Sequence, residues 1–98
     1  MTALIDARVP PALVPSAPTA PLRVRMEEAG VPIPPVVVAA GDVERGKPDP
    51  DPYLKAAELL GVPMSSCMAL EDAPCGYTSA RRAGAQVLLV GDGVPEAS

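Results

Sequence analysis

The sequence has few aromatic residues and little excess charge. Aromatic residues make up 2% of its 98 residues, and phenylalanine and tryptophan do not occur. Single-stranded nucleic acid stacks its bases on aromatic side chains, so the sequence offers no such platform. A formal net charge of −4 also disfavours non-specific binding to a polyanion. We therefore expect no nucleic-acid partner, and we expect a core built from Val, Leu, Ala and Met.

Long apolar runs and a disulfide framework are missing as well. No apolar stretch is long enough to span a bilayer, and Asp6, Arg8 and the early prolines interrupt the apolar run that a secretory signal needs. The two cysteines, Cys67 and Cys75, fit neither a disulfide framework nor a zinc spacing. We expect a cytoplasmic protein with reduced cysteines and no membrane partner.

Proline, in contrast, is abundant and unevenly distributed. The chain has 14 prolines, and the segment 1–21 is rich in proline and alanine. Because proline fixes φ and removes a backbone donor, a long helix or a central strand is not expected there. At best, 12–14 is a short strand. We predict a poorly ordered segment or short strand at 1–21, a core at 22–93 and a tail at 94–98.

Helical and strand-like patterns alternate from residue 22 onward. Their order is helix 22–29, strand 36–39, helix 53–60, strand 67–70, helix 76–83 and strand 86–90. Alternation of this kind is typical of a parallel sheet with crossover helices, so we predict an α/β fold. In the helix 53–60, the spacing places Leu54, Ala57 and Leu60 on the inner face.

Polar residues follow two of the predicted strands. In parallel sheets of this kind, ligands bind beyond the carboxyl ends of the strands. The loop 41–52, which contains Lys47, therefore belongs to the same edge as Glu71 and Asp72. Lys47 lies in a stiff Gly-Lys-Pro stretch. It is either a solvated loop lysine or a compact positive charge held against a phosphate.

The other polar residues at this edge also allow two interpretations each. Glu71 and Asp72 suit Mg²⁺, which takes one or two carboxylates together with waters and a phosphate oxygen. Alternatively, Asp72 caps the following helix by accepting hydrogen bonds from its first free amides. Ser16, just past 12–14, is either an ordinary turn serine or a hydroxyl donor to a phosphate oxygen.

Two longer stretches of the sequence resemble a known family. GDVERGKPDPDPYLKAAELLGV, followed by ALEDAPCGYTSARRAGAQVLLV, is similar to the C-terminal half of the core domain of haloacid dehalogenase-like phosphatases. The similarity is closest to their sugar-phosphate and glycerol-phosphate branch, with its GKPDP-x-x-YL and EDAP-x-G motifs. It covers about residues 13–90. It implies a partial Rossmann-like parallel sheet with flanking helices and hydrolysis of a small phosphomonoester, such as a sugar or polyol phosphate.

The resemblance also implies roles for individual residues. Lys47 matches the lysine that steadies nucleophile and phosphate, and Glu71 and Asp72 match the acidic pair that anchors Mg²⁺. Ser16, in LVPSA, matches the hydroxyl residue that ends the second core strand. A threonine commonly precedes that residue in the family, whereas Pro15 precedes it here. The partner implied is a small phosphorylated metabolite.

The nucleophile that the resemblance requires is not in its expected place. The family's reaction begins at an Asp-x-Asp motif at the end of the first core strand, where the first Asp attacks phosphorus and the second is general acid and base. Asp49-Pro50-Asp51 has this spacing but lies on another loop. Asp6 is followed by Arg8 where the second aspartate should stand. In an antiparallel arrangement, Asp6 would lie at the rim opposite Lys47.

We therefore expect the fold to lack the first core strand and the cap domain. In the family that strand lies mid-sheet, so two edges would be left without a partner and open to other chains. We expect a marginally stable, truncated domain that self-associates or is completed by another polypeptide. Three hypotheses follow: a phosphatase sequence that is inactive as this chain alone, a non-catalytic Mg²⁺- or phosphate-binding module, and a soluble fragment without its own function.

Overall fold

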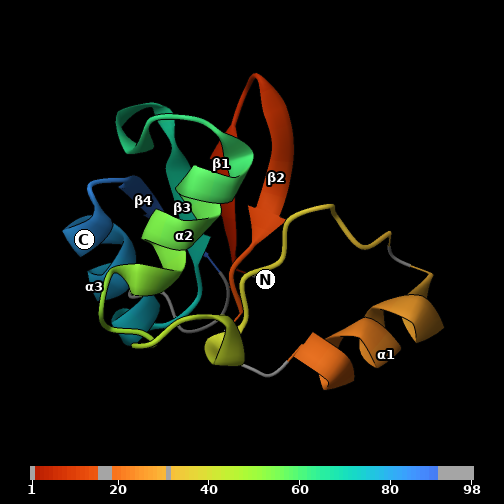
Figure 1. Cartoon of the computed structure of the whole chain (residues 1–98). Helices are drawn as coiled ribbons and strands as arrows, with labels where there is room; N and C mark the ends of the chain where they lie inside the picture. Colours follow the sequence, from red (N-terminus) through yellow and green to blue (C-terminus); the bar gives the residue numbers. More distant parts are fainter. Residues whose placement is uncertain (1, 16–18, 31, 91–98) are drawn as a thin grey trace.

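The structure is a computed structural model, and it describes residues 2–15, 19–30 and 32–90. Its helices, strands and 3₁₀ turns (η) are β1 (Ala3–Asp6), β2 (Val9–Leu13), α1 (Thr19–Ala29), η1 (Ala40–Asp42), α2 (Asp51–Leu60), η2 (Met64–Ser66), β3 (Met68–Glu71), α3 (Pro74–Ala83) and β4 (Gln86–Leu89). Four strands form a sheet in the order β2–β1–β3–β4. Figure 1 shows α2 and α3 together beside this sheet, with α1 set apart from them. The predicted α/β class is confirmed.

The sheet is mixed, although a parallel sheet was predicted. β3 and β4 run parallel, but β1 runs antiparallel to both β2 and β3. The reason lies in the short connection, because only the turn at Ala7 and Arg8 separates β1 from β2. A turn of this length permits a hairpin, whereas a parallel pair needs a crossover of a dozen or more residues.

The N-terminal segment contributes a hairpin to the centre of the sheet. β1 lies between β2 and β3, the position that the resemblance gives to the missing first core strand, but it runs in the opposite direction. The expectation that the edges of β2 and β3 are left bare is therefore wrong for this structure. Each of the two edges pairs with β1 instead.

The strand expected at 36–39 is reduced to a single bridge. Leu13 pairs in parallel with Val37. The Leu13 N–H donates to the Val36 carbonyl at 3.0 Å, and the Val38 N–H donates to the Leu13 carbonyl at 2.9 Å. Earlier in β2, Pro10 and Pro11 carry no backbone donor, so the ladder cannot extend along that edge.

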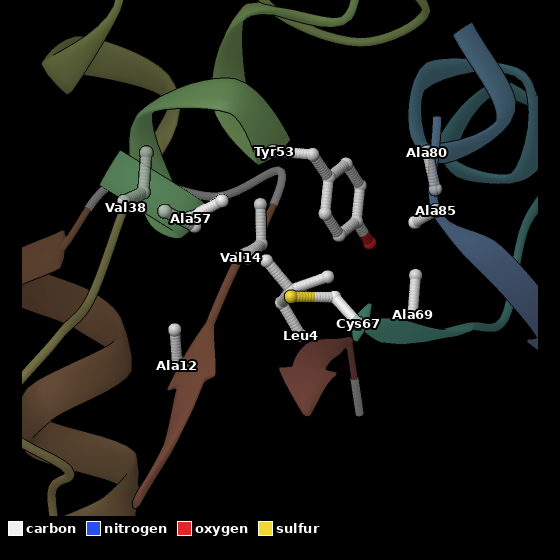
Figure 2. Packing of buried hydrophobic residues seen from close by; sticks show 11 residues of the cluster. Leu4, Ala12, Val14, Val38, Tyr53, Ala57, Cys67, Ala69, Ala80 and Ala85 are labelled. Carbon is white, nitrogen blue, oxygen red and sulfur yellow. The ribbon is translucent and has the colours of Figure 1, made fainter. Parts of the chain in front are cut away.

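The main core lies between the sheet and the helices α2 and α3 (Figure 2). Most of its side chains are small, and one is a tyrosine, Tyr53, which corrects the expectation of an entirely non-aromatic core. α2 and α3 both end at a glycine in the left-handed conformation, Gly61 (φ 72°) and Gly84 (φ 100°), a common helix stop. The buried members are Leu4, Ala12, Val14, Val38, Tyr53, Ala56, Ala57, Cys67, Ala69, Ala80 and Ala85.

The opposite face of the sheet is only partly covered. Met26 of α1 packs against Ala3 and Leu13. Further along this face, Met68 and Leu88 are 40% and 51% exposed. Within the described part of the chain, none of the helices combines the length and the apolar character needed to cross a membrane.

Candidate functional site

Lys47 and Glu71 meet at one end of the sheet. Glu71 is the last residue of β3, and Lys47 lies in the loop between η1 and α2. The Lys47 Nζ donates to Glu71 Oε2 at 2.6 Å and to the Val14 carbonyl oxygen at 2.7 Å. Their side chains are 4% and 1% exposed. In such a dry environment each charge depends on the other for compensation.

Tyr53, to which the sequence assigns no polar role, is the third member of this cluster. It lies in the first turn of α2, and its hydroxyl donates to the same Glu71 Oε2. The Lys47 Nζ lies 5.4 Å from the centroid of the Tyr53 ring, within the range of a cation–π contact. Burial, and then the hydrogen bond to Glu71, raise the pKa of Tyr53 far above its ordinary value. The phenol therefore keeps its proton and remains a donor.

A small cavity of about 210 Å³ lies beside Lys47. Ligand pockets for whole drug-sized molecules are usually larger, so this cavity suits a compact group. The charged side chain in its wall is Lys47, and the exposed thiol of Cys75 also borders it. The lining residues are Pro15, Ala40, Gly46, Lys47, Pro52 and Cys75.

The other predicted site residues have different outcomes. Asp72 directly follows Glu71 and is exposed, but the N-cap of α3 is Ala73. Asp72 therefore precedes the N-cap position, and its role as an acceptor for the first amides of α3 stays a prediction. Ser16 lies outside the described residues, so its role as a phosphate donor stays a prediction.

A Mg²⁺ site is implied by the resemblance, and the donors present here can be tested against it. Among residues 2–15, 19–30 and 32–90, no three His, Cys, Asp or Glu side chains gather in a metal-binding group. Glu71 Oε2 already accepts from Lys47 and Tyr53. On another side, Gly76 packs so closely that a Cβ there would overlap the Glu71 carboxyl. Glu71 Oε2 is thus occupied by two donors, and the ligand roles of Glu71 and Asp72 stay predictions.

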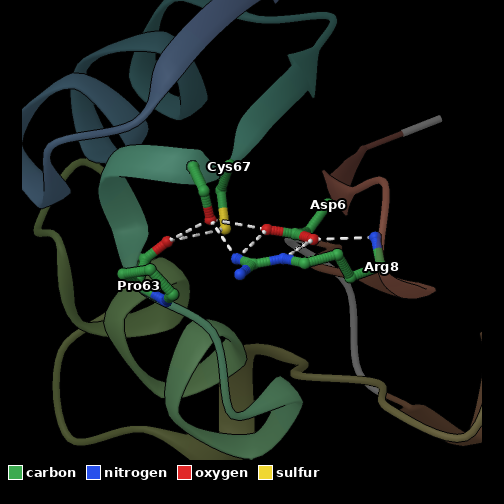
Figure 3. Close-up of polar contacts among 5 residues, drawn as sticks. Asp6, Arg8, Pro63 and Cys67 are labelled. Atoms are coloured by element: carbon green, nitrogen blue, oxygen red, sulfur yellow. Dashed lines mark hydrogen bonds and ion pairs between the residues drawn. The ribbon is translucent and has the colours of Figure 1, made fainter.

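A second polar cluster lies at the opposite end of the sheet (Figure 3). The Asp6 carboxylate accepts from Arg8 Nη2 at 3.0 Å, from the Arg8 backbone N–H at 2.9 Å and from Ser66 Oγ at 2.5 Å. The Arg8 side chain, followed by Ser66, holds the pKa of Asp6 well below its usual range. Asp6 therefore joins the hairpin to η2, far along β1 from Lys47, as expected for an antiparallel strand.

Because β1 is reversed, its first residues lie at the Lys47 end. Thr2 Oγ1 donates to the Val14 carbonyl at 2.8 Å, and Lys47 donates to the same oxygen. A hydroxyl therefore lies near the site where the resemblance would place an aspartate. Sequence patterns carry no signal for Thr2, because its position depends on the direction of β1.

The fold and this buried charge pair define an α/β protein with a small cavity at the carboxyl end of β3. The family model of haloacid dehalogenase-like hydrolases matches residues 1–84. The chain therefore belongs to this hydrolase family, and the resemblance noted in its sequence is confirmed. Hydrolases of this family generally use Mg²⁺.

Several curated proteins are similar to the chain. Hexitol phosphatase A of Escherichia coli (strain K12) is 45% identical over 87 residues, which is 89% of this chain and 40% of that protein. Protein CbbY of Rhodobacter capsulatus is 52% identical over 54 residues, or 54% of this chain and 24% of that protein. Glycerol-1-phosphate phosphohydrolase 2 of Saccharomyces cerevisiae is 36% identical over 69 residues, or 63% and 28%. The chain thus spans 40% or less of the length of these relatives.

Proposed function

We propose that this chain carries the phosphate-binding part of a haloacid dehalogenase-like phosphatase for small phosphorylated sugars or polyols. The observation that carries the proposal is Lys47, a residue with a buried ammonium that lines a cavity large enough for a compact group. The names of two relatives, a hexitol phosphatase and a glycerol-1-phosphate phosphohydrolase, support the substrate class.

The chemistry of Lys47 suits an anion. An ammonium group has three N–H donors, and two of them are used on Val14 and Glu71. The third has no acceptor among residues 2–15, 19–30 and 32–90, and we expect it to donate to a phosphate oxygen. Low local polarity strengthens such a bond, but the nearby Glu71 carboxylate repels the anion. We therefore expect specific binding of modest affinity, in the millimolar range.

We further propose that the chain by itself does not hydrolyse phosphomonoesters appreciably. Asp6, considered as a nucleophile, is bound by Arg8 and Ser66 at the opposite rim. In the stretch Asp49-Pro50-Asp51, the second aspartate begins α2, with the Asp51 Oδ2 3.7 Å from Arg45 Nε. Loss of a nucleophile removes most of an enzyme's rate advantage.

Phosphate titrations of the intact chain test this proposal. Wild type and Lys47→Met are compared by NMR, with Lys55→Met as the control, because Lys55 is an exposed lysine that donates to the Asp42 carbonyl. We expect binding by wild type and Lys55→Met and at least tenfold weaker binding by Lys47→Met, because a charge-assisted bond contributes about 1.5–3 kcal/mol. Equal affinities in all three proteins contradict the proposal.

A second readout does not need a variant that removes a buried charge. Cys75 borders the same cavity as Lys47, so bound phosphate is expected to slow alkylation of Cys75 by iodoacetamide in the wild type. Chloride at equal ionic strength is the control.

The proposed inactivity is tested with p-nitrophenyl phosphate and Mg²⁺, for which we expect no turnover. Clear turnover by wild type would overturn it if Lys55→Met retains this activity and Lys47→Met abolishes it.

A non-catalytic anion-binding module is the second candidate. It is favoured by the hydroxyl of Thr2, which shares the Val14 carbonyl oxygen with Lys47 and offers no carboxylate there. The two candidates are separated by adding a purified polypeptide that contains the Asp-x-Asp strand of a relative. Turnover in the mixture supports a phosphatase that is completed by another chain, and phosphate binding without turnover supports the module.

A further inference from the structure

Tyr53 is a fully buried aromatic residue in a core of small side chains. Its exposed fraction is 0%, and Figure 2 shows its ring between Val14 and the alanines Ala80 and Ala85. A phenol in apolar surroundings is unfavourable unless its hydroxyl finds a partner. Here that partner is the Glu71 carboxylate. The tyrosine thus links the core to the charge pair.

The Glu71 carboxylate is confined by its neighbours. Lys47 and Tyr53 both donate to Oε2, and the backbone of Gly76 closes another side. A carboxylate oxygen can accept two donors. The orientation of the carboxylate, and with it the position of the Lys47 ammonium, therefore depends on the tyrosine hydroxyl as well as on the lysine.

On the basis of the proposed function, we propose that Tyr53 is a positioning residue for anion binding at Lys47. By donating to Oε2, its hydroxyl compensates part of the Glu71 charge, so that the ammonium keeps positive charge for an anion in the cavity. Without this hydroxyl, Lys47 alone must compensate a buried carboxylate. Tyr53 is not among the residues that line the cavity, so it acts through Glu71 and Lys47.

The chain contains two tyrosines, which supplies a matched control. Tyr77 lies on α3, is 36% exposed and has its ring 5.9 Å from the Arg81 guanidinium carbon. Tyr53→Phe and Tyr77→Phe each remove one hydroxyl and keep the ring. We expect Tyr53→Phe to weaken phosphate binding about tenfold, because hydrogen bonds to charged groups are the stronger class. Tyr77→Phe should change it less than twofold.

A readout at the ammonium separates positioning from simple loss of stability. In phosphate-free protein, the ¹⁵Nζ chemical shift of Lys47 is expected to move in Tyr53→Phe and to stay unchanged in Tyr77→Phe. If both variants bind phosphate like wild type, the role of Tyr53 is refuted while the proposed function stands. If wild type itself does not bind phosphate, the proposed function fails first.

A second probe keeps the hydroxyl, in case Tyr53→Phe does not fold. In Tyr77→Phe protein grown with 3-fluorotyrosine, the fluorine label lies only at residue 53. We expect its ¹⁹F resonance to shift when phosphate is added, because the anion changes the Lys47–Glu71 contact that the hydroxyl shares. A resonance that does not respond, while phosphate binding is seen at backbone amides near Lys47, would overturn the inference.

Discussion

The two ends of the sheet hold the same set of polar groups in different surroundings. At one end the Glu71 carboxylate accepts from Lys47 and the Tyr53 hydroxyl, and at the other the Asp6 carboxylate accepts from Arg8 and the Ser66 hydroxyl. Both carboxylates are buried. The cations differ, because the Lys47 side chain is 4% exposed and that of Arg8 is 62% exposed.

This difference in exposure changes what each cluster can do. A buried ion pair costs several kcal/mol to break, since the remaining charge has no partner. A pair with a solvated member contributes little, because water replaces the lost partner. The Lys47 end therefore carries strong local electrostatics beside a cavity, and the Asp6 end serves to hold the β1–β2 hairpin against η2.

The largest expected effect comes from removing the buried cation. Lys47→Met leaves the Glu71 carboxylate buried without its counter-ion, and we expect a loss of about 3–5 kcal/mol in the free energy of unfolding. That is a large part of the stability of a domain of this size. Urea denaturation measures it, with Lys55→Met as the exposed control. Equal urea midpoints for Lys47→Met and Lys55→Met would contradict this expectation, because Lys47 would then contribute no more stability than an exposed lysine.

Gly76→Ala tests the packing around the same carboxylate. The added Cβ must displace the Glu71 carboxyl from Lys47 and Tyr53, so we expect destabilisation by about 2–4 kcal/mol. In the double variant Lys47→Met/Glu71→Ala, the buried ion pair is removed, and with it the Glu71 carboxyl that the added Cβ would overlap. There the substitution should stabilise α3 by about 0.5–1 kcal/mol, because alanine is the better helix former. A cost that is the same in both backgrounds would contradict this explanation.

The contact of Lys47 with Glu71 could be foreseen because it depends on local patterns. The carboxyl-end rule places the loop after 36–39 and the end of β3 at the same edge of the sheet, although β2 and β1 lie between them. Tyr53 could not be foreseen in the same way. Helical spacing predicts Leu54, Ala57 and Leu60 on the inner face of α2, whereas the buried residues are Pro52, Tyr53, Ala56 and Ala57. The burial of a hydroxyl depends on its acceptor, which lies 18 residues away.

Local patterns also do not show that β1 enters the middle of the sheet, although its short connection to β2 excludes a parallel pair. Its four residues, ALID, give too short a pattern to identify a strand, and the prolines of this segment disfavour a central strand. β1 pairs with both β2 and β3. The pairing with β3 joins segments that lie far apart in the sequence, so local patterns do not predict it. A family resemblance predicts a gap at this position, but it cannot predict which segment of the same chain fills it.

At the Asp6 end, the effect of pH is expected to be smaller and specific. The pKa of Asp6 is lowered in the folded state, so its contribution is present above its unfolded pKa of about 3.9. It is lost as the pH falls toward the folded pKa. Melting temperatures of wild type should therefore exceed those of Asp6→Asn near neutral pH, and the difference should shrink by about pH 2.5. Glu44→Gln, at an exposed residue, is the control, and a constant difference with pH would refute the linkage.

The smallest effect concerns Cys67, the cysteine at the Asp6 end of the sheet. Cys67 is buried near the Asp6 cluster, with Sγ 3.4 Å from the Pro63 carbonyl oxygen, and burial raises the pKa of its thiol. We expect slow alkylation of Cys67 in wild type. Arg8→Ala should lower the global stability much less than Lys47→Met does, because Arg8 is solvated, but it should speed this alkylation a few fold, because the hairpin end opens locally. Arg45→Ala is the control, since Arg45 is similarly exposed and its guanidinium lies near Asp51. If both variants alkylate like wild type, Arg8 does not hold the hairpin closed, and the two ends of the sheet differ in more than the exposure of their cations.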